Sequence, residues 1–584
     1  MKRYICNPIV LNYPTKAITN NRAGGFGFQV IHPHRGTGDP SVEFFKGKYY
    51  MTGSFSGFWY SENLVDWYFK EGEGMMRGAA GDFCAIGDYL YHTASSTEKC
   101  IITRSKDPLN EKFELVATFP FAYWDPCLFL DDDGRVYLYH GCSNVDPIYG
   151  IELDRETMMP IGENVILIPG AGDPDKHGWE RHGTNNDPSI GKLRVGETYA
   201  PGLEYNRPWI EGPYMTKYNG KYYLQYAATG TEYEIYADGV YVSDKPLGPF
   251  TYCPNSPFSA KTNGFYNGAG HGSTFRDVYG NWWHATTMVG GTTETMRKTG
   301  LFPLGFDKDG IMYCNMNFSD YPHIMPDGPA DPNSLFTGWM LLSYNKPVTA
   351  SSTMVGHPTS YLTDENCQTY WAASRRESGE YIIMDLEKVV DMRAVQLYFI
   401  DHDVNSLMFI PNVKFAALPP EKQFVRHRWL LEGSVDGVNW EILCDKREAD
   451  SNLAIDFIVF EEGKDVRYLR LTSYEMPYYN VFAMCGFRVF GHANGDPPAK
   501  VTSFDLRRDK EDPCTFTLKW EPSEGADGYN IKWGIAPDKL YHCTMIYGKN
   551  ELIVHSLNAD ADYYLQIDAF NGSGITEGDC VPLV

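Results

Sequence analysis

Apolar and polar positions alternate along the first 300 residues of the chain in a phrase that occurs five times. Each copy begins with a small or acidic residue, continues with an apolar run, turns at a glycine and ends in a second run rich in Tyr and Trp. The copies span residues 39–50, 79–91, 125–137, 211–223 and 271–283. A strand, a tight turn and a second strand that recur at such intervals are typical of a β-propeller. The pattern therefore predicts five blades.

The residues that open the copies are candidates for a shared site. In a propeller the innermost strand of each blade lines a central channel, so the starts of the blades converge on the axis. Four of the five copies open on an ionisable side chain, namely Asp39, Asp125, Glu211 and His271. We expect these four side chains to meet in one pocket.

Two further regions follow the repeats. Clusters of Gly, Pro, Asp and Asn at 327–334 and 495–498 are typical of linkers. Between the linkers, short strands are predicted at 381–386, 393–399, 428–434 and 467–471, and after the second linker at 516–520, 528–533 and 563–568. No long amphipathic helical period is present. We therefore predict an all-β chain with a propeller in residues 1–335 and β-sandwiches in 340–493 and 498–584.

Composition and charge exclude several classes of partner. Aromatic residues make up 15% and charged residues 22% of the chain, which favours a β-rich globular protein over a disordered one. The net charge of -24, without a basic cluster, disfavours nucleic acids and anionic membranes as partners.

No segment approaches the roughly 20 consecutive apolar residues of a membrane-spanning helix. Asn7, Pro8, Asn12 and Pro14 interrupt the apolar stretch that a signal sequence would need near the beginning of the chain. Thirteen cysteines without paired metal-ligand spacing predict mostly buried free thiols and at most a few disulfides, with little support for zinc. These features leave open a cytoplasmic protein or a mature secreted one.

The repeat region resembles glycoside hydrolase family 43, the five-bladed propellers of arabinan and xylan breakdown. The resemblance covers nearly all of residues 20–330. It rests on motifs in the order of the family, each near the start of a repeat, at 38–42, 124–126, 211–213 and 270–273, together with the segment 61–67.

The resemblance implies catalytic roles for three carboxyl groups. It makes Asp39 the general base, Glu211 the general acid, and Asp125 the residue that orients the acid and tunes its pKa. Inverting hydrolysis needs an acid for the leaving oxygen and a base for water on the opposite ring face, with carboxyl groups about 6.5–9.5 Å apart. Glu211 would have to be protonated near neutral pH and Asp39 ionised. The alternative for each Asp-Pro pair is an ordinary turn.

Further residues are predicted to contact the substrate or a metal ion. The resemblance implies substrate contacts for Arg297 and a water-mediated calcium near His271, whose alternative role is structural hydrogen bonding. Trp124, Phe58 and Trp209 are candidates for a stacking platform under the sugar ring. A loop at 171–205 is predicted to cover the site and to supply contacts from His177, Trp179, His182 and Asn186.

The two appended regions also resemble known modules. Residues 345–491 are similar to the discoidin, or coagulation factor 5/8 type C, fold, with a calcium ligand expected at Asp364, although no late acidic ligand precedes the final strand. This module either binds sugar or serves as a spacer. Residues 499–584 resemble a fibronectin type III domain, with Trp520 in an early strand and Tyr563 in a tyrosine corner. By analogy, such modules imply a secreted or periplasmic location.

The sequence thus predicts an inverting, exo-acting glycosidase that removes arabinofuranosyl, xylosyl or galactosyl units from plant-type glycans. The chemistry requires no cofactor, and a structural calcium is the only metal expected. The alternative is a catalytically silent carbohydrate-binding or scaffold protein on the same fold.

Overall fold

The computed structural model describes residues 2–15, 18–20, 30–32, 35–55, 57–188, 207–231, 233–290, 297–402 and 425–584. These residues form strands and a few short 3₁₀ turns, which confirms the all-β prediction. The turns are η1 (Gly178–Glu180), η2 (Thr184–Asn186), η3 (Pro332–Ser334), η4 (Thr359–Leu362) and η6 (Pro477–Tyr479). None of the helical segments in the described ranges has the length and apolar character to cross a membrane.

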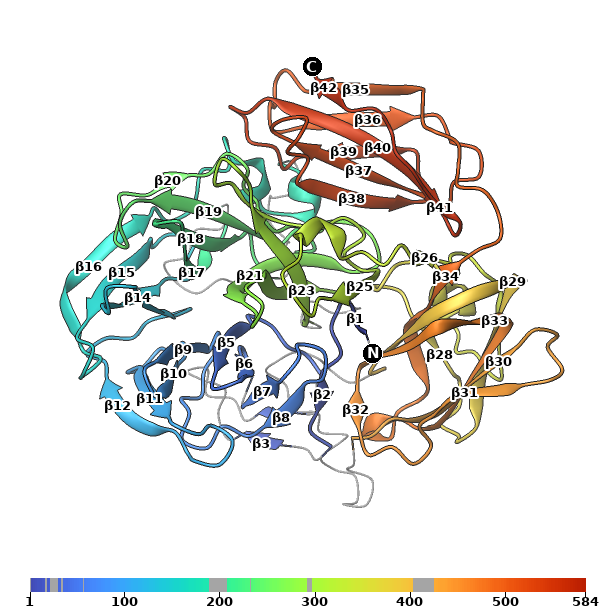
Figure 1. The fold of residues 1–584 in the computed structure, drawn as a ribbon, viewed down its shortest axis with the longest axis horizontal. Helices are drawn as coiled ribbons and strands as arrows, with labels where there is room; N and C mark the ends of the chain where they lie inside the picture. The colour runs from blue at the N-terminus through green and yellow to red at the C-terminus, as the bar shows by residue number, and fades with distance from the viewer. Residues whose placement is uncertain are drawn as a thin grey trace.

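Five four-stranded antiparallel sheets, each made from consecutive strands, form the blades of the propeller (Figure 1). The first two blades are β5 (Ser41–Phe45), β6 (Lys48–Thr52), β7 (Phe58–Ser61) and β8 (Tyr68–Lys70), then β9 (Asp82–Ile86), β10 (Tyr89–Thr93), β11 (Ile101–Ser105) and β12 (Glu114–Thr118). The third is β13 (Cys127–Leu130), β14 (Val136–His140), β15 (Ile148–Leu153) and β16 (Pro160–Ile168). The last two are β17 (Glu211–Tyr218), β18 (Lys221–Ala228), β19 (Ala237–Ser243) and β20 (Thr251–Tyr252), then β21 (Asn267–Arg276), β22 (Trp282–Val289), β23 (Arg297–Phe306) and β24 (Met312–Cys314). Each predicted repeat is the first hairpin of one blade.

Each blade has a residue in the left-handed backbone conformation just before its innermost strand or within the first part of that strand. Its φ is 56° at Asp39, 45° at Ala80, 48° at Asp125, 58° at Gly212 and 52° at His271. Left-handed backbone is uncommon outside glycine, although Asp and His tolerate it better than most residues. In the fourth repeat this position is Gly212, so Glu211 lies one residue earlier than the other openings.

The middle sandwich has two layers because two long strands run through both. Strands β29 (Glu380–Phe399) and β33 (Ile455–Glu475) pair along nearly their whole length, and β29 shows register shifts at 385–390 and 392–394. Their paired halves join β27 (Val348–Ala350), β30 (Arg428–Ser434) and β31 (Glu441–Asp445) on one side, and β26 (Met340–Leu341), β28 (Trp371–Ala372) and β34 (Ala483–His492) on the other. Trp371, Trp429 and Phe487 are among the buried side chains of the core.

The C-terminal sandwich packs a three-stranded sheet on a five-stranded one around Trp520, Trp533 and Tyr563. The first sheet is β35 (Phe504–Arg508), β36 (Phe516–Trp520) and β39 (Glu551–Val554). The second is β37 (Gly528–Gly534), β38 (His542–Tyr547), β40 (Tyr563–Asn571), β41 (Gly574–Thr576) and β42 (Val581–Leu583).

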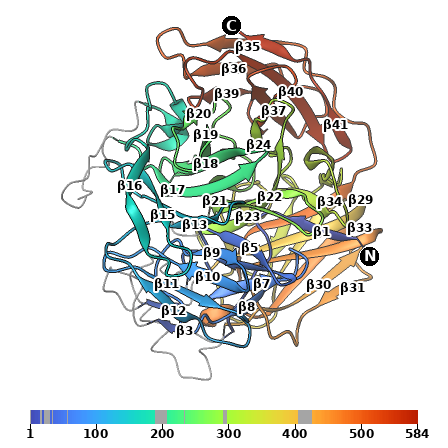
Figure 2. The same ribbon diagram turned by 60° about the vertical axis from the view of Figure 1, so that its left-hand side comes forward.

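Both sandwiches pack directly on the propeller (Figure 2). The C-terminal sandwich lies against the fourth and fifth blades, where Arg181 donates two hydrogen bonds to Asp512 at 2.7 and 2.8 Å and Tyr313 stacks on Tyr541. The middle sandwich is tied to the segment between β24 and β25, just after the fifth blade, by Arg488, which donates to the backbone oxygen of Asp320 at 2.6 Å.

Short strands near the start of the chain join the first two regions. Strand β1 (Arg3–Cys6) pairs with β25 (Pro322–Met325), which follows the last blade. Strand β2 (Asn12–Tyr13) pairs with β32 (Asn452–Leu453) of the middle sandwich. Strands β3 (Ile18–Asn20) and β4 (Val30–His32) pair with each other.

The segment after the third blade contacts the C-terminal sandwich. Trp179 is buried in the core of the propeller, and the Gly178 N–H donates to the Leu557 oxygen at 2.9 Å. His177 forms an isolated bridge with Asn558. The Trp179 indole N–H donates to the Tyr252 hydroxyl at 2.9 Å, and the His177 ring stacks on the Tyr252 ring. Because Tyr252 lies in β20, the last strand of the fourth blade, the prediction that His177 and Trp179 reach the substrate is wrong. Residues 189–205 of the predicted loop lie outside the described residues.

Candidate active site

The four residues that open the predicted repeats come together in one cluster. The His271 Nδ1 atom lies 3.5 Å from Asp39 Oδ1 and 3.8 Å from Asp125 Oδ2. Asp125 Oδ2 accepts a hydrogen bond from the Gly212 N–H, next to Glu211, at 3.2 Å. Blades one, three, four and five thus each contribute a side chain to one cluster.

Hydroxyl groups at the ends of the second strands hold the blade openings in place. The Ser95 hydroxyl accepts from the Asp125 N–H at 2.8 Å and donates to Asp125 Oδ1 at 3.3 Å. The Thr287 hydroxyl accepts from the Asp39 N–H at 2.7 Å. Each bond links one blade to the next one around the ring, so the ring of blades also orients the carboxyl groups.

Two glycines leave room for the cationic side chains of the site. A Cβ atom on Gly38 would lie 2.6 Å from the guanidinium carbon of Arg297, and one on Gly212 would lie 2.7 Å from the ring of His271. Such contacts are far shorter than van der Waals distances, so a larger residue would displace either cation. This explains the glycines in the motifs 38–42 and 211–213.

Asp39 is surrounded by groups that favour its ionised form. Arg297 Nη1 donates to both Asp39 oxygens, at 2.7 and 2.8 Å, and the Ser54 hydroxyl also donates to this carboxylate. Burial alone would raise the pKa of Asp39, but Arg297, His271 and the Ser54 hydrogen bond outweigh it and hold the pKa below its ordinary value. Asp39 is therefore a carboxylate at neutral pH.

Asp125 and His271 are shifted in the opposite direction. Burial, and then the neighbouring carboxylates Glu211 and Asp39, raise the pKa of Asp125 to about 7, although His271 opposes the shift. Burial would lower the pKa of His271, but the charges of Asp39 and Asp125 raise it above its ordinary value. The site thus combines an ionised carboxylate, a carboxyl group whose pKa is raised to about 7 and an imidazole whose pKa is also raised.

Glu211 is held by two residues that sequence reasoning missed. The Tyr236 hydroxyl donates to Oε1, and the Cys142 thiol donates to Oε2 at 3.1 Å. Tyr236 lies just before β19 and Cys142 just after β14, outside the repeated phrase that pointed to the carboxyl groups. Ser54 and Ser95 had a detectable signal, because each follows the second strand of its repeat by two residues.

One of the three residues of the predicted aromatic platform is buried inside the propeller. Phe58 is fully buried and packs edge-on against Phe83 and Phe113 between the first two blades, so the prediction that it stacks on a sugar is wrong. Trp124 and Trp209 are half-buried; Trp124 directly precedes Asp125, and Trp209 lies two residues before Glu211. Their stacking role stays a prediction.

The calcium predictions are not tested by the structure. Among the described residues, the group of three potential metal-ligating side chains is Asp125, Cys142 and Glu211, which includes neither His271 nor Asp364. The Asp364 oxygens instead accept from the Asn366 N–H at 3.1 Å and the Thr369 hydroxyl at 2.7 Å, which does not resemble an open calcium site.

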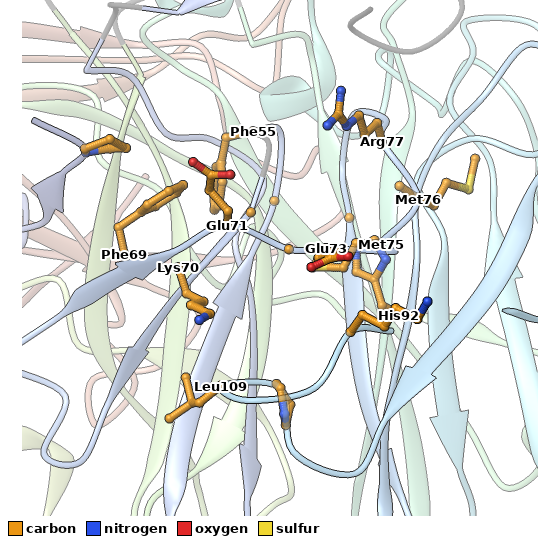
Figure 3. A pocket seen from close by; sticks show the side chains of 18 of the residues that line it. Phe55, Phe69, Lys70, Glu71, Glu73, Met75, Met76, Arg77, His92 and Leu109 are labelled. Carbon is orange, nitrogen blue, oxygen red and sulfur yellow. The ribbon is translucent and has the colours of Figure 1, made fainter. Parts of the chain in front are cut away.

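A second cavity, of about 900 Å³, lies between the first two blades (Figure 3). Phe55 and Phe69 lie on one side of it, and Met76, Arg77 and His92 lie on the other. None of the described residues that line it is one of the predicted catalytic groups.

The raised pKa of Asp125 predicts a pH-dependent stability difference. Between its ordinary value of 3.8 and about 7, the folded protein holds a proton that the unfolded chain releases, so this group destabilises the fold as pH rises. Asp125→Asn removes that penalty. We expect the melting temperature of the variant, minus that of the wild type, to increase between about pH 5 and pH 8.

The matched control is Asp88→Asn, the same substitution at an exposed position outside the cluster. Thermal denaturation followed by circular dichroism measures both variants. A constant difference for Asp125→Asn across this range would contradict the shifted titration.

Part of the chain is similar to known proteins. The family model of glycosyl hydrolases family 43 matches residues 34–312. A β-xylosidase of Xylanibacter ruminicola is 30% identical over 192 residues, and a xylosidase/arabinosidase of Humicola insolens is 28% identical over 211 residues. The matches cover 31% and 32% of this chain, and the chain spans 53% and 57%, about half, of the length of these two relatives.

A solved glycoside hydrolase structure aligns with a TM-score of 0.43 and 18% identity, over 78% of this chain and 97% of that one.

The predicted resemblance is confirmed by the family model for the repeat region, whereas the resemblances of the two sandwiches stay predictions. Residues 34–312 form a glycosyl hydrolase family 43 domain.

Proposed function

We propose that the protein is an inverting, exo-acting glycosidase that removes xylosyl or arabinofuranosyl units from plant-type glycans. The observation that carries the proposal is the cluster of Asp39, Asp125 and Glu211 around His271 within a family 43 domain. Relatives with the names β-xylosidase and xylosidase/arabinosidase favour these pentoses over galactosyl units.

In the proposed mechanism, the sugar ring lies between the acid and the base. Glu211 gives its proton to the leaving oxygen while the C–O bond breaks through an oxocarbenium-like transition state. Asp39 takes a proton from the attacking water, whose oxygen bonds to the anomeric carbon from the opposite face. Proton exchange with solvent after product release restores both groups. The net reaction consumes one water and inverts the anomeric centre.

Asp125 and Arg297 prepare the acid and the base for this reaction. The Asp125 carboxyl binds the backbone of Gly212 and so orients the adjacent Glu211. Arg297 keeps Asp39 ionised, as a base requires, and its partner in this structure is Asp39. Contact between Arg297 and the substrate remains part of the proposal.

A panel of nitrophenyl glycosides tests the activity and the sugar together. We expect hydrolysis of the β-xyloside or the α-arabinofuranoside, and proton NMR of the first product should show the inverted anomer. Net retention would contradict the inverting mechanism. Sugar binding without turnover, on the panel and on natural oligosaccharides, would favour the catalytically silent alternative.

We further propose that the middle sandwich is discoidin-like and the last one fibronectin type III-like. Two observations support the assignment of the last sandwich. It packs a three-stranded sheet on a five-stranded one, and the Tyr563 hydroxyl accepts a hydrogen bond from the Asn558 N–H at 3.0 Å, as in a tyrosine corner. The interface of the middle sandwich with the propeller supports a role as spacer. By analogy with such modules, we propose a secreted or periplasmic location and a carbohydrate as the partner.

A further inference from the structure

A thiol stands among the candidate catalytic groups. Cys142 follows β14 and is half-buried, and its sulfur lies 3.1 Å from Glu211 Oε2. Ligand atoms of Asp125, Cys142 and Glu211 all lie within 4.8 Å of one another. The hydrolytic mechanism gives this thiol no chemical step, so its presence at the acid calls for a separate explanation.

One sulfur and two carboxylate oxygens form a ligand set for a particular class of cation. Zinc and similar thiophilic ions accept Cys, Asp and Glu in tetrahedral sites, with bonds of about 2.0–2.3 Å, and leave a fourth position for water in open sites. Calcium and magnesium prefer oxygen ligands alone, so sulfur disfavours them here. We propose that Asp125, Cys142 and Glu211 bind a thiophilic divalent cation of the zinc class, which occupies the acid and stops it from donating a proton.

The side chains need little movement to close on an ion. Ligands of a tetrahedral ion with these bond lengths are roughly 3.3–3.8 Å apart, so the widest separation in the cluster has to shrink by about 1 Å. Binding replaces the thiol proton and any proton on the two carboxyl groups, which pass to solvent. No oxidant or other reactant is needed.

Hydrogen bonds from outside the ligand set already orient the carboxyl groups. Tyr236 holds Glu211 through Oε1 and leaves Oε2 facing the sulfur. Ser95 and the Gly212 N–H hold Asp125. Such second contacts commonly change metal affinity by about 10–100-fold, because they fix the direction of the lone pairs. Of the basic side chains of the site, Arg297 lies beside Asp39, and His271 lies between Asp39 and Asp125, with Nδ1 3.5 Å from Asp39 Oδ1 and 3.8 Å from Asp125 Oδ2.

Cobalt(II) is the probe for binding, because a cobalt–thiolate bond gives a charge-transfer band in the near ultraviolet. We expect the full-length wild type to develop this band with one equivalent of Co²⁺ and to lose it when Zn²⁺ is added. Cys142→Ser, which keeps the shape of the side chain, should abolish the band. Glu211→Gln should weaken cobalt binding by at least about tenfold.

The matched control is Cys580→Ser, because Cys580 is an exposed free thiol that offers an adventitious site. This variant should retain the band. No band with the wild type, or a band that survives in Cys142→Ser, would overturn the proposed site. Circular dichroism of both serine variants establishes that each is folded.

The inhibitory part of the inference rests on the proposed function, whereas the binding part does not. With an active wild type, Zn²⁺ should inhibit hydrolysis, a chelator should restore it, and Cys142→Ser should need at least about tenfold more Zn²⁺ for half inhibition. Equal zinc sensitivity of the two proteins would overturn the proposal. A wild type that shows the cobalt band but cleaves no glycoside would contradict the proposed function and leave the metal site standing.

Discussion

Replacing Glu211 by Gln is expected to lower kcat/KM on a natural xylo- or arabino-oligosaccharide by about 10³-fold, while the loss on the matching nitrophenyl glycoside is much smaller. A positioned general acid contributes about 10²–10⁴-fold, because it protonates the leaving oxygen in the transition state. Nitrophenolate is a good leaving group and depends less on that proton. The ratio of the two losses, from steady-state kinetics on both substrates, therefore identifies the acid.

Asp39→Asn is the matched control for this experiment. A general base acts on the attacking water, so its removal should lower kcat/KM by a similar factor on both substrates. Equal losses on the two substrates for Glu211→Gln would remove Glu211 from the role of acid. A greater loss on the oligosaccharide for Asp39→Asn would reverse the two assignments.

Replacing Arg488 by Met is expected to destabilise the fold by about 3–5 kcal/mol, because it leaves a carboxylate without its partner in the interior. Arg488 and Glu365 form a two-bond ion pair at 2.9 and 3.0 Å, and their side chains are 1% and 3% exposed. The same guanidinium donates to the Asp320 oxygen of the propeller and lies 4.4 Å from the ring centre of Phe265. Urea denaturation should show the loss as a lower midpoint.

Two further variants separate charge from packing at this interface. The double variant Arg488→Met with Glu365→Leu should recover most of the loss, because no uncompensated charge remains. Arg507→Met removes an exposed pair with Asp505, whose side chains are 76% and 55% exposed, and should change stability by about 0.5 kcal/mol at most. An Arg488→Met protein as stable as this control would contradict the role of the buried pair.

Much of the fold was predictable because its local signals repeat. The alternation and the glycine turns of each hairpin place the two inner strands of every blade. The motifs around Asp39 and Asp125 come directly before the first strands of their blades, whereas His271 lies within β21. Glu211 was found through its family motif, although it lies one residue before the equivalent position in the other blades.

The partners of the carboxyl groups were less predictable, since they depend on contacts between distant segments. Cys142 and Arg297 approach the site from the ends of other strands, and no local pattern links them to Glu211 or Asp39. Phe58 was mistaken for a sugar platform because an aromatic residue in a strand packs equally well between blades. Trp179 is likewise buried in the propeller core, where its indole N–H donates to the Tyr252 hydroxyl.

The pairing of β1 with β25 and of β2 with β32 has a consequence for biosynthesis. Strands β1 and β2 leave the ribosome long before their partner strands. Their backbone N–H and C=O groups therefore remain bound to solvent or to a chaperone while all five blades are synthesised. A stalled chain that ends before Leu453 would keep β2 unpaired. We therefore expect the pairing of β2 with β32 to form late in translation, after residues 452–453 have been synthesised.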